Sequence, residues 1–213
     1  MDTNAKFQAL INDEWDFRMC EYPLQATLSG DQRFNDQLGH FSPADYQRRL
    51  AQMQVFHQRG QAIQRSDLSP EEQLNYDIFL RVLQGEIEEL RYGAYYYPLN
   101  KTDAFFNFFL ELYAFVPLAN ESDLHNYVSR LAGFHEFARE HIELMRHGLH
   151  LGYRPPRPIL VGVADNLRQQ LSTDLDQFPL LSPFTGSFQG VTSQPGLAET
   201  AHKLILTSVK PGL

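Results

Sequence analysis

The stretch from His135 to His141 carries the residue types from which a catalytic zinc site is built. Zinc peptidases place two histidines four residues apart around a glutamate, so that both imidazoles leave one face of a helix. Here His135 and His141 stand six residues apart, with Glu136 directly after the first. At about 100° per residue, six steps turn the second side chain about 240° away from the first. We therefore expect no shared metal at this pair and interpret the histidines as part of a solvated helix face.

Two arginines beside a double proline are a second candidate for binding chemistry. Arg154 and Arg157 flank Pro155 and Pro156 just before the start of an expected helix. The first N–H groups of a helix, together with guanidinium donors, can hold a carboxylate or a phosphate. The alternative is structural, with both arginines paired to carboxylates of neighbouring helices.

Three consecutive tyrosines form the third candidate. Tyr95, Tyr96 and Tyr97 follow a helical pattern, and Asn100 ends the same connector. Such a segment can line a cleft for a peptide or a sugar. Aromatic residues at a helix-to-loop junction are more often core residues whose hydroxyls are hydrogen-bonded, and this remains the alternative.

Composition excludes several classes of partner. The 213-residue chain has a formal net charge of -8 and no cluster of lysine and arginine, whereas nucleic acids and anionic membranes require a basic surface. The longest apolar run, Phe105 to Val116, indicates a buried helix and is far shorter than the roughly 20 residues that cross a bilayer. We therefore expect no nucleic-acid partner and no membrane span. Cys20 is the only cysteine, so the sequence predicts no internal disulfide and leaves the compartment open.

Hydrophobic periodicity predicts an all-α protein, with a single helical domain over residues 1–213 and long antiparallel helices in an irregular bundle. The central element is a long helix that Asn120 caps and Gly152 ends, because glycine favours the left-handed conformation that stops a helix. Apolar residues at steps of three and four predict a buried stripe along it. The stripe consists of Leu124, Tyr127, Val128, Leu131, Phe134, Ala138, Ile142, Met145 and Leu149.

Other local signals predict the remaining elements. Ser42 and Ser69, each followed by proline, are expected to cap two helices that pair antiparallel. One helix should span residues 158–175, and residues 93–100 should form an extended connector or a short edge strand. After a last short helix, residues 211–212 are expected to form a turn.

Several short motifs follow one another in a recognisable order. They are a Phe-x-x-Leu-Ile-x-x-x-Trp-like opening helix, Pro23 with Ala26, Thr27 and Gly30, the run from Tyr96 to Asn100, Tyr127 with Arg130 and Leu131, and the stretch from Met145 to Arg157 that leads into Ile159 to Leu167. This order resembles the N-terminal part of the bacterial family catalogued as domain of unknown function 885. The resemblance covers nearly the whole chain.

Members of that family look like all-helical zinc peptidases of the gluzincin kind, in which a His-Glu-x-x-His helix and a downstream glutamate lie beyond the region matched here. The resemblance implies a non-catalytic N-terminal wall of the substrate cleft, completed by a zinc-binding C-terminal half of the same polypeptide. This chain contains no His-Glu-x-x-His motif, so we expect no catalytic residue, no metal ligand and no activity in the chain alone. A peptide is the expected substrate. The candidate cleft residues are Tyr95, Tyr96, Tyr97, Asn100, Arg154 and Arg157.

An alternative function is a self-contained helical module that binds a protein or peptide without catalysis. The two functions differ in what they require of the last helices. A complete module should bury their apolar side chains, whereas part of a larger protein should leave some of them open. The resemblance suggests an exported or periplasmic protein, with the cytoplasm as the alternative location.

Overall fold

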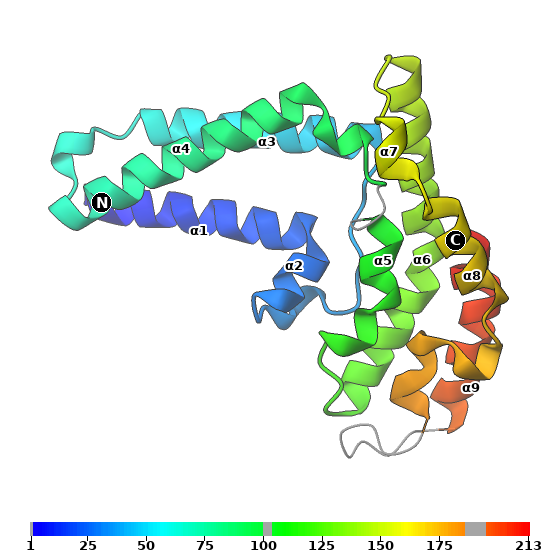
Figure 1. Ribbon diagram of the computed structural model, residues 1–213. Helices are drawn as coiled ribbons and strands as arrows, with labels where there is room; N and C mark the ends of the chain where they lie inside the picture. The colour runs from blue at the N-terminus through cyan, green and yellow to red at the C-terminus, as the bar shows by residue number, and fades with distance from the viewer. Residues whose placement is uncertain (1, 100–103, 186–194) are drawn as a thin grey trace.

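The computed structural model describes residues 2–99, 104–185 and 195–213, and every regular element within these ranges is a helix. This confirms the predicted all-α class. Figure 1 shows a helical arm that projects sideways from an upright bundle built on the longest helix. The α-helices are α1 (Thr3–Glu21), α2 (Pro23–Leu28), α3 (Pro43–Gln61), α4 (Pro70–Tyr92), α5 (Phe105–Leu110), α6 (Glu121–His150), α7 (Arg157–Leu160), α8 (Val163–Ser172), α9 (Pro195–Leu204) and α10 (Lys210–Gly212). Among the described residues, no helix has the length and hydrophobicity needed to cross a bilayer.

The arm consists of α1, α3 and α4, which lie side by side (Figure 1). Ser42 caps α3 by accepting a hydrogen bond from Asp45 N, and the Asp45 carboxylate accepts one from Ser42 N at 3.0 Å. Ser69 caps α4 by accepting from Glu72 N at 3.4 Å. Because α3 runs outward to the tip of the arm and α4 returns, the two predicted starts and the antiparallel pairing are confirmed.

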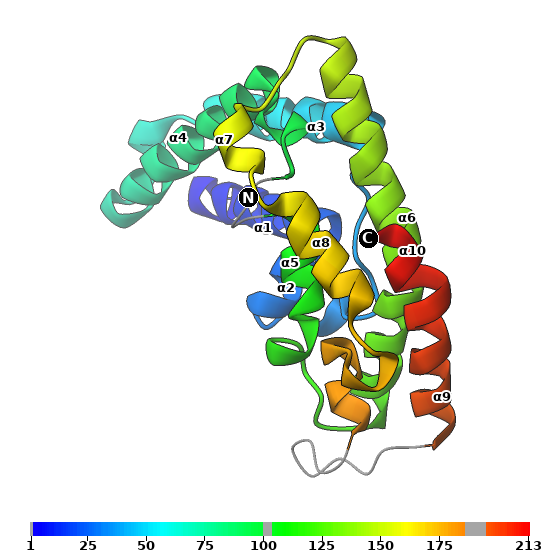
Figure 2. The same ribbon diagram turned by 45° about the vertical axis from the view of Figure 1, so that its right-hand side comes forward.

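The bundle is organised by the 30-residue helix α6. Asn120 caps it by accepting from Asp123 N at 3.0 Å, and Gly152 beyond its end has φ +89°, as predicted for the stop signal. In Figure 2, α9 and α10 run along one side of α6. The core between α5 and α6 is aromatic, since Phe109 stacks on Phe134 with 4.0 Å between ring centroids.

The predicted stripe on α6 is correct in the middle of the helix and wrong towards its end. Ile142 and Leu149 are 36% and 53% exposed, while Leu144 and Gly148 are buried instead. The reason is the neighbour that α6 meets there. Tyr96 packs directly on Gly148, where a Cβ atom would lie 2.7 Å from Tyr96 Cβ, and this contact selects a different face of the helix.

Three other predicted elements differ from the structure. In place of one helix over residues 158–175, the chain forms α7 and then α8, which ends at Ser172, because Gly162 adopts φ +87° between them. The connector after α4 contains a 3-10 turn, Ala94–Tyr96, in place of a strand. The apolar run after residue 104 is also divided, since α5 ends at Leu110 and a 3-10 turn follows over Leu112–Ala114.

The C-terminal segment stays helical to its end instead of turning at residues 211–212. After α9, a π-helical turn spans Ile205–Val209 and leads directly into α10. The hydroxyl of Ser208 donates to Ala132 O at 3.0 Å and accepts from His135 N at 3.1 Å, which fixes this turn against α6. The π turn and α10 therefore belong to the bundle core.

Buried polar side chains join the arm to the bundle. The Glu140 carboxylate on α6 accepts from Phe41 N at 2.7 Å and lies 2.9 Å from His40 Nδ1. Nearer the N-terminus of α6, Arg130 is 1% exposed and donates to the carbonyl oxygen of Gln37 at 2.9 Å and to the hydroxyl of Thr27 at 2.6 Å. These bonds position the segment between α1 and α3, which connects these two helices of the arm.

Candidate functional site

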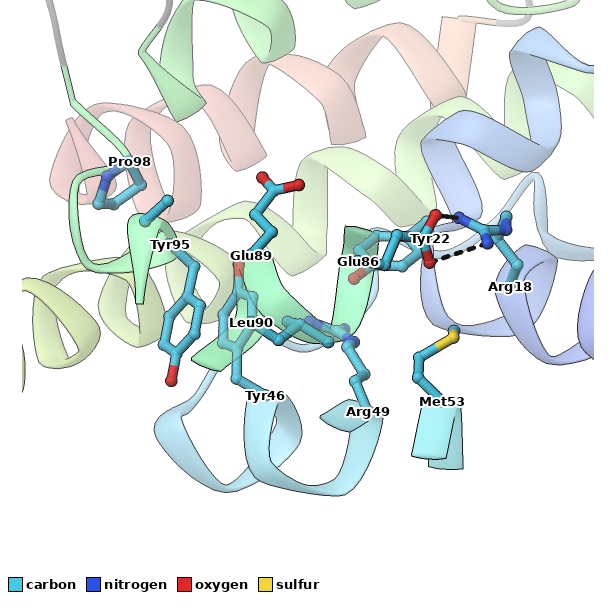
Figure 3. A pocket seen from close by; sticks show the side chains of 11 residues that line it. Arg18, Tyr22, Tyr46, Arg49, Met53, Glu86, Glu89, Leu90, Tyr95 and Pro98 are labelled. Carbon is cyan, nitrogen blue, oxygen red and sulfur yellow. Dashed lines mark hydrogen bonds and ion pairs between the residues drawn. The ribbon is translucent and has the colours of Figure 1, made fainter. Parts of the chain in front are cut away.

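A cavity of about 420 Å³ opens at the base of the arm, where the end of α1, the start of α3 and the end of α4 meet. Its volume lies within the roughly 300 to 1,000 Å³ typical of small-molecule sites. Figure 3 shows the side chains around it, with Arg49 reaching from α3 into the middle of the group and Tyr95 standing beside Tyr46. We call this space the arm-base cavity.

Arg49 is the buried charged residue of the arm-base cavity, with 1% of its surface exposed. Its Nε donates to Glu21 Oε2 at 2.9 Å, and its Nη2 donates to the carbonyl oxygens of Glu21 at 3.2 Å and His40 at 2.5 Å. A guanidinium has five N–H groups, and these bonds use three of them. Nη1, which carries the other two, is buried without a hydrogen-bond partner in the described part of the chain.

Aromatic rings hold the Arg49 guanidinium in place. Its Cζ lies 4.6 Å from the ring centroid of Tyr22, 4.9 Å from that of Phe41 and 5.0 Å from that of Tyr46. Such cation–π contacts are strongest when the cation is removed from water. The position of Nη1 is therefore set by packing on several sides.

Neighbouring ion pairs leave Arg49 with only part of one carboxylate. Glu21, its acidic partner, also forms an ion pair with Arg48, which binds Asp45 at 2.9 Å as well. The other arginine on the cavity wall, Arg18, binds Glu86 at 2.6 and 2.9 Å, and its side chain is 24% exposed, so its remaining N–H groups can reach water. Arg49 is thus the cavity arginine with a buried nitrogen that has no partner among the described residues.

Two stacked tyrosines form part of the cavity wall. The rings of Tyr46 and Tyr95 are nearly parallel, 7° apart, with centroids at 3.9 Å. Burial raises the pKa of both hydroxyls above the usual range, so both remain protonated at neutral pH and can donate hydrogen bonds. Met53 and Leu90 add apolar surface to the same space.

The structure separates the residues that the sequence grouped as a cleft. Tyr95 lines the arm-base cavity, whereas Tyr96 is buried against Gly148 and Tyr97 packs edge-on to Tyr153 at 5.8 Å. Tyr153 also lies 4.8 Å from Tyr96, so the tyrosine connector and the proline corner do meet. Arg154 and Arg157 are both exposed, and neither forms an ion pair with a described residue. Asn100, the remaining predicted cleft residue, lies outside the described residues.

Arg49 was missed by the analysis of the sequence, although a signal was present. It follows Tyr46 by three positions and precedes Met53 by four, so it lies on the apolar face of its helix. A charged residue at such a position either reaches solvent or is buried with partners. Which of these applies depends on Tyr22 and Glu21, which come from another helix.

His135 and His141 of α6 lie in different surroundings. His135 is exposed, while His141 is buried, donates from Nδ1 to Phe137 O at 2.8 Å and stacks on Phe105 with centroids 4.5 Å apart. The predicted separation around the helix is therefore confirmed. The interpretation of both histidines as part of a solvated face is correct for His135 and wrong for His141, which packs among Phe105 and Phe137. No group of three or more histidine, cysteine, aspartate or glutamate side chains in the described ranges is placed to hold a metal ion.

Comparison with known proteins gives one match. The model of a family described as "Bacterial protein of unknown function (DUF885)" matches residues 23–213, which run from the start of α2 through α10. No curated protein and no solved structure matches the chain. Arg49, Tyr46 and Tyr95 lie within the matched region, and Arg18 and Tyr22 precede it.

Proposed function

Because the chain belongs to the bacterial family DUF885, whose members it resembles in the order of its motifs, we propose that it forms the non-catalytic helical region of a zinc-dependent peptidase of the gluzincin kind. In this proposal the arm-base cavity is part of the substrate cleft. The observation that carries it is the composition of this cavity, which combines the predicted cleft residue Tyr95 with apolar walls and one under-used arginine. A few polar groups in a mainly apolar space are typical of sites for small ligands and peptides.

Exposed apolar side chains in the C-terminal third support a partner that packs on this part of the chain. Large apolar patches left open on a surface mark places where other polypeptide packs. We propose that the partner is the C-terminal half of the same polypeptide. The side chains concerned, all at least 39% exposed, are Leu149, Leu151, Ile159, Val161, Leu171 and Leu206.

Zinc enters this proposal only through that second half. The described residues offer no three-ligand group, so they do not fit a catalytic zinc, which requires three protein ligands and activates a bound water. We propose that the ligands and the general base belong to a His-Glu-x-x-His helix elsewhere in the parent polypeptide. The role left to the described residues is to bind and orient the peptide.

A second candidate is a binding module that acts without catalysis. The arm-base cavity favours it as well, since a cavity of about 420 Å³ can hold a ligand with no metal present. Catalysis by the parent polypeptide distinguishes the two functions, because ligand binding is common to both.

The test compares the chain with the whole polypeptide of its parent gene. We expect the whole polypeptide to contain one zinc per molecule by elemental analysis and to cleave fluorogenic peptides, and the chain alone to do neither. In the whole polypeptide, Tyr95→Ala should raise KM for a peptide without loss of zinc. Tyr92→Ala is the matched control, since Tyr92 ends α4 nearby but is 73% exposed. A whole polypeptide without zinc and without peptidase activity would leave the binding module as the function.

A further inference from the structure

We propose that the arm-base cavity binds the carboxylate of a ligand with an apolar body, and that Arg49 Nη1 donates the hydrogen bonds that hold it. The inference rests on the proposed function only for the source of the carboxylate, a peptide C-terminus. The role of Arg49 follows from its own contacts.

Arg49 is incompletely hydrogen-bonded. A buried N–H group of a charged side chain that lacks an acceptor is strongly destabilising, and nearly all such groups in native proteins have a partner. One other buried side-chain atom among the described residues, Ser182 Oγ, is also without a partner. Arg49 lines the arm-base cavity of about 420 Å³, whereas Ser182 is not part of its wall.

The size of the cavity distinguishes a ligand from a single water molecule. A water occupies about 30 Å³ of liquid, and a cavity made to hold one is correspondingly small. The space beside Arg49 is about 420 Å³, more than ten times that volume. One water could satisfy Nη1, but it would leave the apolar walls of Met53 and Leu90 uncovered.

Charge favours a carboxylate over a neutral acceptor. Glu21 shares its charge between Arg48 and Arg49, so the Arg49 guanidinium, which lines the arm-base cavity, is incompletely neutralised. Hydrogen bonds from a guanidinium to a carboxylate are roughly twice as strong as those between neutral groups. Figure 3 shows the Glu89 carboxylate turned away from Arg49, and Glu86 is bound to Arg18, so neither acidic residue on the wall serves Nη1.

The walls define the body of the ligand. The stacked rings of Tyr46 and Tyr95, together with Met53 and Leu90, present apolar and aromatic surface to the cavity. Aromatic and aliphatic groups gain most from burial against such surface. A carboxylate attached to an aromatic or aliphatic side chain therefore fits the site better than a small hydrophilic acid.

The experiment measures binding of three probes to the chain by calorimetry and by NMR of the Arg49 guanidinium. The probes are N-acetyl-L-phenylalanine, its C-terminal amide and hydrocinnamate. We expect N-acetyl-L-phenylalanine to bind and the amide, which differs only by its neutral end, to bind about tenfold more weakly or worse. Hydrocinnamate separates the sources, since it offers the same carboxylate without any peptide group.

Two neighbouring arginines provide matched variants. Arg49→Gln should weaken the acid about tenfold or more and abolish the difference between acid and amide, while Arg48→Gln should change the affinity less than about threefold. Arg48 is the control because it lies beside Arg49 on α3 and shares Glu21, yet lines a different cavity. If Arg49→Gln does not fold, Ala94→Phe provides the test, since Ala94 lines the arm-base cavity and a larger side chain should block it.

Three results would overturn the inference. They are equal binding of acid and amide, no binding of either carboxylate at millimolar concentration, and full affinity in Ala94→Phe. The proposed function fails separately. If both carboxylates bind the chain while the whole polypeptide cleaves no peptide, the carboxylate site stands without the peptidase.

Discussion

Arg49 in the arm and Arg130 in the bundle are both 1% exposed, yet their surroundings differ in a way that separates binding from structure. Arg130 has no carboxylate partner among the described residues, but it donates to the carbonyl oxygens of Gln37, Phe34 and Pro23. The cavity beside it measures about 10 Å³, which is room for one water at most. Arg49 has a carboxylate partner, a buried Nη1 without a hydrogen-bond partner among the described residues, and a neighbouring cavity of about 420 Å³. Burial alone therefore does not identify a functional arginine; unused donors beside open space do.

The electrostatic environment of Arg130 fits this distinction between the two arginines. Burial lowers the pKa of Arg130 to about 10, so the side chain stays charged at neutral pH while bonded mainly to backbone oxygens. Its positive charge is stabilised by the dipoles of the backbone carbonyl groups that accept its hydrogen bonds. Arg130 thus connects α6 to the segment between α1 and α3, and a ligand has no place there.

The largest expected effect is on Arg130. Arg130→Gln should reduce the free energy of unfolding by about 3 kcal/mol or more, because several buried acceptors on α2 and the loop after it lose their donor at once. Urea denaturation followed by circular dichroism measures this loss. A change below about 1 kcal/mol would mean that water replaces the guanidinium and that Arg130 is not structural.

The next largest effect is the dependence of stability on pH. Burial lowers the pKa of His141 to about 4, and the charge of Arg49 acts in the same direction. Since an unfolded histidine titrates near 6.5, the unfolded state binds more protons between pH 6.5 and 4, and stability falls as the pH drops through this window. The loss should reach about 3 kcal/mol. Urea unfolding at pH 7 and pH 4.5 measures it.

Two variants decide whether this dependence belongs to His141 and the arm base. His141→Gln should flatten the curve between pH 6.5 and 4. In Arg49→Gln the pKa of His141 should rise, because one nearby positive charge is gone, and NMR titration reports it directly. His40 contributes with the opposite sign. Its hydrogen bond to Glu140 raises its pKa, so its stabilisation is present at low pH and is lost as the pH rises through the folded pKa.

Substitutions at two glycines of α6 test how closely this helix packs against Tyr96 and against Leu38. Gly148→Ala should destabilise by about 2 kcal/mol, because the new Cβ would lie 2.7 Å from Tyr96 Cβ beside the arm-base cavity. Gly133→Ala should instead stabilise by up to about 1 kcal/mol, since its Cβ meets only Leu38 at 3.6 Å and alanine favours the helix. Thermal unfolding of both variants is sufficient. Equal effects would show that the contact with Tyr96 is loose.

The smallest expected effect on stability is that of Arg49→Gln, about 1 kcal/mol. The substitution removes the ion pair with Glu21 and the cation–π contacts, but it also removes a buried nitrogen that has no partner. Glu21 keeps Arg48. A loss as large as that of Arg130→Gln, measured by the same urea titration, would contradict the assignment of Arg49 to a binding site.

The elements that were predicted correctly depend on neighbours in the sequence. The caps at Ser42 and Asn120 bond to backbone N–H groups three residues ahead, so the chain reveals them locally. The roles of Arg49 and Arg130 could not be predicted in the same way, because Arg130 meets Gln37 across 93 residues and Arg49 meets Glu21 across 28. The split at Gly162 was missed because the apolar period continues on both sides of it.

The π-helical turn at Ile205–Val209 sets the rotational phase of the C-terminal segment. A π turn holds one residue more than the corresponding α-helical turn, so if the same residues formed a regular α-helix, everything beyond them would be rotated by about 100°. Gly212 would then leave its place, where a Cβ would already lie 3.1 Å from the ring of Phe134. The extra residue is a phase adjustment that brings the smallest side chain of the segment to the tightest contact with α6.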